Sequence, residues 1–136
     1  MKGTIKVTEK YAFQDNIKSV LFVSSASGNT GAEFPEYAAS KGGVIAYMKN
    51  VALRIAKYHA TSNSISPGGV ITDLNDHILK NENLYEAVLN ETLLHRWSDV
   101  EEMAKWAFFL TVINKSMTAQ DILIDNGEAA KSNFIW

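Results

Sequence analysis

The stretch that decides the fold class is SVLFVSSASG, residues 19–28. Its first half, from Ser19 to Ser24, is a short run of β-branched and aromatic apolar side chains, typical of a strand that is buried on both faces of a parallel sheet. Its second half is small and polar, as expected of a loop at the carboxyl end of such a strand. We therefore predict a buried parallel strand that runs into a polar loop.

The segment after this loop predicts a long helix over residues 36–58. Pro35 suits the first turn of that helix. Gly42 and Gly43 each cost a helix about 1 kcal/mol relative to alanine, so we expect another segment to approach this backbone closely. The apolar positions recur at spacings of three and four and form one stripe: Val44, Tyr47, Met48, Val51, Ile55 and Tyr58.

The rest of the chain predicts two more strands with helices between them. A weaker, more polar strand is expected at about residues 61–66, and a third strand at residues 122–124. Residues 73–95 indicate irregular helical segments. This order predicts an α/β protein: a three-stranded parallel βαβαβ sheet with helices packed across it.

A further helix is expected to begin after Ser98. Glu101 follows three residues later, and this spacing predicts a capping box, in which each side chain accepts a hydrogen bond from the backbone amide of the other residue. The apolar face of the helix would carry Met103, Trp106, Ala107 and Leu110.

Composition excludes several classes of function. The 136 residues are 46% hydrophobic and carry 13 basic and 15 acidic side chains, a net charge of −2 that does not favour binding to nucleic acid. No cysteine is present to form disulfides or to ligate a metal. Apolar runs such as residues 20–23 are far shorter than the roughly 20 residues that span a bilayer. We expect a cytoplasmic protein without a membrane segment or a metal site.

Tyr37 and Lys41 are the first candidates for chemistry. They lie at i and i+4, so they share one face of the long predicted helix. An ammonium beside a phenol favours the phenolate and lowers its pKa from about 10, which lets the tyrosine exchange a proton near neutral pH. Alone, a pair at this spacing is more often part of a solvated helix surface. Ser25 precedes Tyr37 by twelve residues and follows the predicted strand, where α/β proteins place ligand-contacting groups.

A third motif, NSISPGGVIT at residues 63–72, follows the second predicted strand. Ser25, the Tyr37-x-x-x-Lys41 pair and this motif, in this order, resemble the short-chain dehydrogenase/reductase family. The resemblance extends from about Gly3 to Gly127, and it implies that residues 1–136 form a single partial domain, the C-terminal half of a Rossmann fold.

The resemblance also implies an activity: NAD(P)-dependent hydride transfer on a hydroxyl or carbonyl substrate. Tyr37 would act as general acid/base, Lys41 would bind the nicotinamide ribose and lower the tyrosine pKa, and Ser25 would polarise the substrate oxygen. The cofactor, NAD or NADP, would also contact Pro67, Gly68, Val70 and Thr72. The partners implied are a small alcohol or ketone and a second copy of the chain, bound through residues 36–58.

One part of the family pattern is missing from the sequence. No glycine-rich strand–turn–helix that cradles phosphates is present, because the glycines fall at 3, 28, 31, 42, 43, 68, 69 and 127. We therefore expect the N-terminal dinucleotide-binding half to be absent. The alternative function is a catalytically inactive fragment that retains only folding or self-association.

Overall fold

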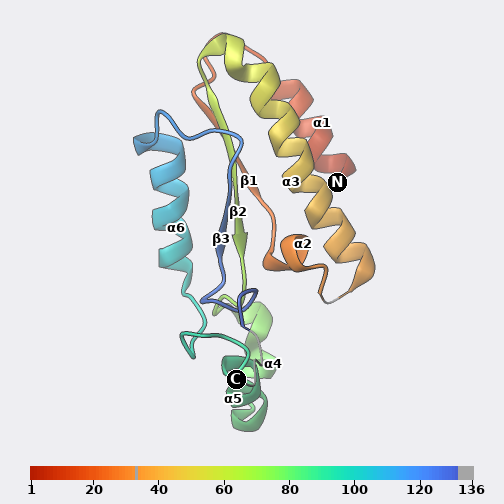
Figure 1. The fold of residues 1–136 in the computed structure, drawn as a ribbon, viewed down its shortest axis with the longest axis vertical. Coiled ribbons are helices and arrows are strands. Elements are labelled where there is room, and N and C mark those ends of the chain that lie inside the picture. Colours follow the sequence, from red (N-terminus) through yellow and green to blue (C-terminus); the bar gives the residue numbers. More distant parts are fainter. Residues whose placement is uncertain (33, 132–136) are drawn as a thin grey trace, which may run out of the picture.

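Three parallel strands form the centre of the molecule, and helices cover both of their faces (Figure 1). The computed structural model describes residues 1–32 and 34–131. The strands are β1 (Ser19–Val23), β2 (Thr61–Pro67) and β3 (Asp121–Ile124), in the order β1-β2-β3. Helices α1 (Lys2–Tyr11) and α3 (Pro35–Ile55) lie on one side of the sheet, and α6 (Val100–Phe108) lies on the other. The predicted three-stranded parallel α/β arrangement is confirmed.

The main apolar core lies between α3 and the sheet. The buried face of α3 carries the predicted stripe, with Met48, Val51 and Ile55 fully buried, and it packs on Phe22 of β1. The α-helix ends at Ile55 and is followed by a 3₁₀ turn over Ala56–Tyr58. The helix predicted to reach residue 58 therefore comprises α3 and this turn. The two glycines lower the helix propensity of α3, so the burial of these large apolar side chains is what stabilises the helix.

The polar strand expected to be weak is the central and longest one. The three buried serines in the middle of this strand all donate hydrogen bonds. Ser62 Oγ donates to the Met48 carbonyl at 3.0 Å, and the Ser64 and Ser66 hydroxyls donate to the Asp121 carboxylate at 2.5 and 2.8 Å. These hydrogen bonds offset the cost of burying polar side chains, while the lower stability expected of this strand stays a prediction.

Short helices connect the strands at the carboxyl end of the sheet. Helix α2 (Ala26–Thr30) follows β1, and the region predicted as irregular helix contains a 3₁₀ turn (Asp73–Asn75), α4 (Asp76–Leu79) and α5 (Glu82–Leu89). After α6 the chain passes through a π-helical segment, Phe109–Ile113. Within the described ranges, no helix is both long and apolar enough to cross a membrane.

The predicted capping box at the start of α6 is displaced by one residue. The cap is Asp99, whose carboxylate accepts from the Glu102 amide at 2.8 Å, while the Glu102 carboxylate accepts from the Asp99 amide at 3.0 Å. Ser98 is buried and pairs its backbone with residues 69–71, so its side chain is not at the helix end. The prediction that Ser98 and Glu101 form the capping box is wrong, because the contact with residues 69–71 buries Ser98.

Candidate active site

A cavity of about 430 Å³ opens where the parallel strands end, between α2, the start of α3, the loop after β2 and the α4–α5 region. The carboxyl ends of parallel strands are where α/β proteins bind ligands. Of the residues singled out from the sequence, five line this cavity: Ser25, Tyr37, Gly68, Val70 and Thr72. The structure thus brings together side chains that are up to 47 positions apart in the chain.

Ser25 lies just after the carboxyl end of β1 and is the N-cap of α2. Its hydroxyl oxygen accepts from the Ser27 amide at 3.3 Å and donates to the Ser27 hydroxyl at 3.2 Å. Ser27 is buried, whereas Ser25 is half-buried and reaches the cavity. The serine is therefore fixed in orientation by its own helix turn and still presents oxygen lone pairs to a ligand.

A close backbone contact places α3 beside this serine. A Cβ on Gly28 would lie 2.8 Å from the Lys41 carbonyl carbon, a distance that only glycine avoids. The Gly28 carbonyl oxygen in turn lies 3.2 Å from the position of a Cβ on Gly42, so α2 packs directly on the α3 backbone. Ser24 Oγ donates to the Lys41 carbonyl at 2.9 Å and fixes the same contact. This is the close approach that the paired glycines predicted.

Tyr37 and Lys41 lie one turn apart on α3. Lys41 Nζ is 5.6 Å from the centroid of the Tyr37 ring and donates to the Val23 carbonyl, at the end of β1, at 3.1 Å. The Tyr37 side chain is 42% exposed and makes no hydrogen bond with any described residue. An ammonium has three N–H donors, so this contact leaves two free for a ligand.

The loop after β2 turns a backbone donor toward the cavity. Val70 forms an isolated parallel bridge with Ser98, in which Ser98 bonds the Gly69 carbonyl at 3.1 Å and the Ile71 amide at 2.9 Å. The Val70 amide points to the other side and donates to no described residue, whereas its carbonyl accepts from Asn75 at 2.7 Å. Since Val70 lines the cavity, this amide is a donor available to a ligand.

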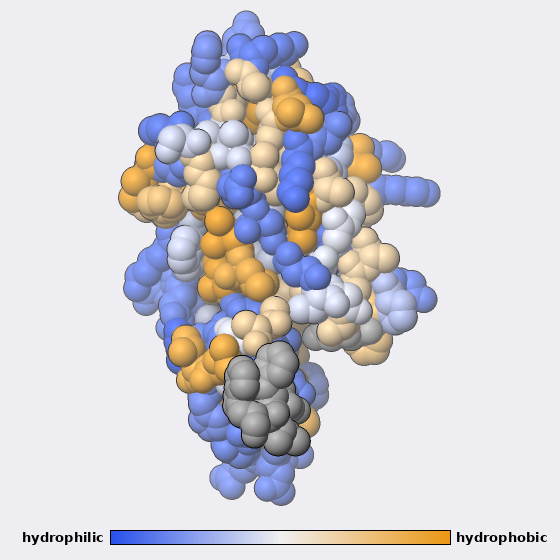
Figure 2. Space-filling view, viewed as in Figure 1, coloured by the Kyte–Doolittle hydropathy of each residue, from blue (hydrophilic) through white to orange (hydrophobic). Residues whose placement is uncertain are grey.

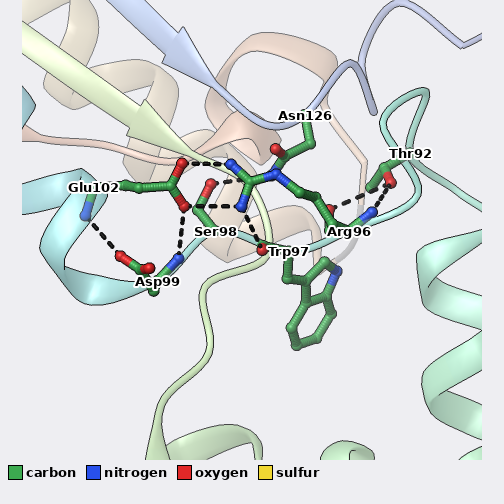
Figure 3. A network of polar contacts seen from close by, with 7 residues as sticks. All are labelled: Thr92, Arg96, Trp97, Ser98, Asp99, Glu102 and Asn126. Carbon is green, nitrogen blue, oxygen red and sulfur yellow. Dashed lines mark hydrogen bonds and ion pairs between the residues drawn. The ribbon is translucent and has the colours of Figure 1, made fainter.

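A polar network on the α6 side of the cavity holds the segment that precedes α6 (Figure 3). Arg96 forms two hydrogen bonds with the Glu102 carboxylate, one of them at 3.0 Å. These bonds, and one from the Asp99 amide, lower the pKa of Glu102 to about 2. Asn126 donates to the Ser98 hydroxyl at 3.0 Å, and the Arg96 amide donates to the Thr92 hydroxyl at 3.1 Å. The network fixes Trp97, which stands between Arg96 and Ser98.

Trp97 forms part of the cavity wall that the sequence did not predict. A Cβ on Gly69 would lie only 2.2 Å from the indole ring, so the ring rests directly on the glycine backbone. The sequence also gave no role to the other cavity residues from the α4–α5 region. These are Leu74, Asn75, Ile78, Val88 and Glu91, with Glu128 from the turn after β3.

Two predicted site residues do not line the cavity. Lys41 lies behind Tyr37, with its ammonium on the end of β1, and Pro67 is the last residue of β2. No cluster of three or more metal-ligating side chains occurs among residues 1–32 and 34–131.

Comparison with known proteins assigns the family. The family model described as enoyl-(acyl carrier protein) reductase matches residues 2–128. A solved structure of a short-chain dehydrogenase family protein from Francisella tularensis superposes with a TM-score of 0.79 at 30% identity, over 94% of this chain and 57% of the other. The chain belongs to the short-chain dehydrogenase/reductase family. The family resemblance seen in its motifs is confirmed.

Two relatives of this short-chain dehydrogenase/reductase chain have named activities. L-rhamnose 1-dehydrogenase (NADP(+)) from Thermoplasma acidophilum is 31% identical over 79% of this chain and 43% of its own length. A 3-oxoacyl-(acyl-carrier-protein) reductase from Chlamydia pneumoniae is 32% identical over 82% of this chain and 43% of its own length. The chain therefore spans less than half the length of these relatives.

Proposed function

We propose that this chain carries the catalytic half of an NAD(P)-dependent oxidoreductase that interconverts a hydroxyl and a carbonyl group. The observation that carries the proposal is the convergence of Ser25 and Tyr37 on one cavity, with Lys41 anchored behind the tyrosine. The named activities of the two relatives are of the same reaction class.

The residues around the cavity fit the nicotinamide end of the cofactor. The free donors of Lys41 suit ribose hydroxyls, and the free amide of Val70 suits a carboxamide oxygen. Gly68 and Thr72 line the same space, and Pro67 immediately precedes it. When bound, the cofactor supplies the hydride, and the protein supplies orientation and proton transfer.

Tyr37 is the general acid/base of the proposed reaction. In the direction of reduction, its hydroxyl gives a proton to the oxygen that was the substrate carbonyl; in oxidation, the phenolate removes a proton from the alcohol. Lys41, one turn further along α3, holds its ammonium 5.6 Å from the centroid of the Tyr37 ring. On substrate binding, Ser25 would turn its hydroxyl proton from the Ser27 hydroxyl to the same substrate oxygen and so polarise the carbonyl.

Replacement of the Tyr37 hydroxyl tests this assignment. With the full chain, NADH or NADPH and a panel of ketones, we expect consumption of reduced nicotinamide that Tyr37→Phe lowers by about a hundredfold or more, the usual contribution of a positioned acid/base. Tyr11→Phe is the matched control, because Tyr11 lies on α1, outside the cavity. Absence of both cofactor binding and turnover contradicts the proposal and favours the alternative, a fragment that only folds or self-associates.

We also propose that copies of the chain associate through α3. The outward face of this helix carries Ala39, Ala46 and Leu53 at intervals of seven residues, and Leu53 is 79% exposed. Small side chains flanking an exposed leucine allow two helices to approach closely, and burying the leucine would remove apolar surface from water.

A further inference from the structure

The outer edge of β1 carries backbone groups that no described strand pairs. On its inner edge, the Ser24 amide and the Lys18 carbonyl form hydrogen bonds with β2 at 2.8 and 3.1 Å. Successive residues of a strand turn their amide and carbonyl groups to opposite edges, so those of Ser19, Leu21 and Val23 point away from β2. β1 stands first in the sheet order, and nothing in the described part of the chain extends the sheet on that side.

One side-chain contact agrees with this direction. Lys41 Nζ, on α3, donates to the Val23 carbonyl at 3.1 Å, at the carboxyl end of the outer edge. The amides of Ser19, Leu21 and Val23 and the carbonyls of Ser19 and Leu21 form no hydrogen bond with a described residue. A row of unpaired backbone groups is a template for one more strand.

A groove of about 420 Å³ lies beside this edge, between β1 and α1. It is lined by every residue of β1 and by one face of α1, and none of its described lining residues is charged. Val7 and Tyr11 on α1 are 60% and 55% exposed, and Val23 is 57% exposed. Apolar surface therefore stands in water beside unpaired backbone groups, a combination that an extended apolar segment would cover.

We propose that a separate polypeptide adds an extended, uncharged segment to the outer edge of β1, alongside α1. At about 3.3 Å per residue, five residues of the partner match the length of β1. The partner's backbone bonds the unpaired groups, and its side chains fill the groove. A charged side chain there would lose its water without meeting an opposite charge in the described lining. This interaction goes beyond the proposed oxidoreductase function and does not depend on it.

A second copy of the chain fits this edge less well. Pairing of two β1 edges about a two-fold axis would place both α1 helices on the same face of the joined sheet, beside one groove. The strand at the other edge of the described sheet, β3, is four residues long and begins with the charged Asp121. An uncharged strand from a different polypeptide meets neither obstacle.

The probe is a capped seven-residue peptide of alternating threonine and valine, added to the full chain and followed by amide hydrogen exchange. At saturating peptide we expect exchange at Ser19, Leu21 and Val23 to slow by about tenfold or more. Exchange at Val20 and Phe22, which face β2, should change far less. Unchanged exchange at the outer amides overturns the proposal. Slow exchange in the chain alone also overturns it, and protection that grows with the concentration of the chain identifies a second copy as the occupant.

An N-methylated peptide separates strand addition from apolar adhesion. Methyl groups on three consecutive central amides block both edges of the peptide and keep every side chain. This peptide should bind at least about tenfold more weakly, because it cannot form the backbone hydrogen bonds. Equal binding of the two peptides contradicts strand addition.

Matched variants locate the contact. Val7→Glu places a charge on the α1 wall of the groove and should weaken binding of the unmethylated peptide by about tenfold. Val100→Glu is the control, since Val100 is 58% exposed at the start of α6 and does not line the groove. If the two variants bind the peptide equally well, the groove beside β1 is not where it docks.

Discussion

The Trp97 indole ring packs directly on the backbone of Gly69 beside the cavity. The indole ring occupies the space where any other residue at position 69 would place its Cβ, at 2.2 Å. The ring also packs edge-to-face against Tyr85 of α5, with centroids 6.2 Å apart. Trp97 therefore links the loop after β2 to the α5 side of the cavity, and the shape of that wall depends on the absence of one methyl group.

Gly69→Ala tests this dependence. The added methyl group should displace Trp97 and destabilise the fold by about 1–3 kcal/mol, the usual cost of overpacking. It should also weaken ketone binding, because the displaced ring no longer forms the wall. Urea unfolding and ligand titration measure the two effects.

Gly3→Ala is the matched control, since a Cβ there meets nothing within 4 Å and the residue lies on exposed helix α1. It should stabilise the helix by up to about 1 kcal/mol. If Gly69→Ala is as stable as the parent chain and binds ketones equally well, the indole ring does not depend on this glycine.

Helices α1 and α3 are joined by a cluster around one carboxylate. Glu9 accepts two hydrogen bonds from Arg54, at 2.6 and 2.8 Å, and one from the Tyr47 hydroxyl at 2.9 Å. The Arg54 guanidinium also stacks 3.8 Å from the centroid of the Phe13 ring. The bonds from Arg54 and then Tyr47 lower the pKa of Glu9 to about 2, while burial and the bond to Glu9 raise the pKa of Tyr47.

This cluster predicts a loss of stability in acid. The carboxyl pKa of Glu9 is depressed on folding from 4.5 to about 2, so its contribution is complete above about pH 4.5 and is lost as the pH falls through about 2. Glu102, with its pKa also lowered to about 2, adds to the same slope. We expect Glu9→Gln to flatten the dependence of the unfolding free energy on pH in this window.

A double-mutant cycle gives the control for this prediction. Arg54→Gln should flatten the slope as Glu9→Gln does, and the two changes together should have no additional effect. Urea unfolding between pH 5 and pH 2 measures the slope, using about half-unit steps. Additive effects of the two changes show that the ion pair is not the source of the acid sensitivity.

The sequence predicted those elements whose signal is local. The apolar run of β1 and the three- and four-residue spacing of α3 arise from burial along a single segment, and both were located within a few residues. The cap of α6 was misplaced because Ser98 is buried by pairing with residues 69–71, a contact between distant parts of the chain. The partners of the buried serines of β2 could not be predicted for the same reason, since the Asp121 carboxylate that accepts their hydrogen bonds lies on β3.

Part of the candidate site could be predicted from local motifs, and part of it depends on tertiary contacts. Ser25, Tyr37 and Val70 follow from motifs with fixed spacing, and the structure places all three on one cavity. Glu91 comes from a region with no recognisable pattern, and Trp97 was given no role in the site. Both join the cavity only because the chain folds back across the ends of the strands.

At the scale of the molecule, apolar surface remains uncovered. No described strand pairs with the outer edge of β1, and Val23 at its end is 57% exposed. Figure 2 shows apolar side chains reaching the surface over the middle of one face, between more hydrophilic ends. Exposed strand edges and apolar surface both favour association with another chain.

Association through α3 gives the last prediction. In sedimentation velocity at micromolar concentration we expect the chain to form oligomers. Leu53→Glu should weaken that association by about tenfold or more, because it places a charge at the most exposed apolar position of the helix. Leu94→Glu is the matched control, since Leu94 is 65% exposed and lies outside α3. A monomeric parent chain contradicts the prediction outright, and equal effects of the two variants assign the contact to a surface other than α3.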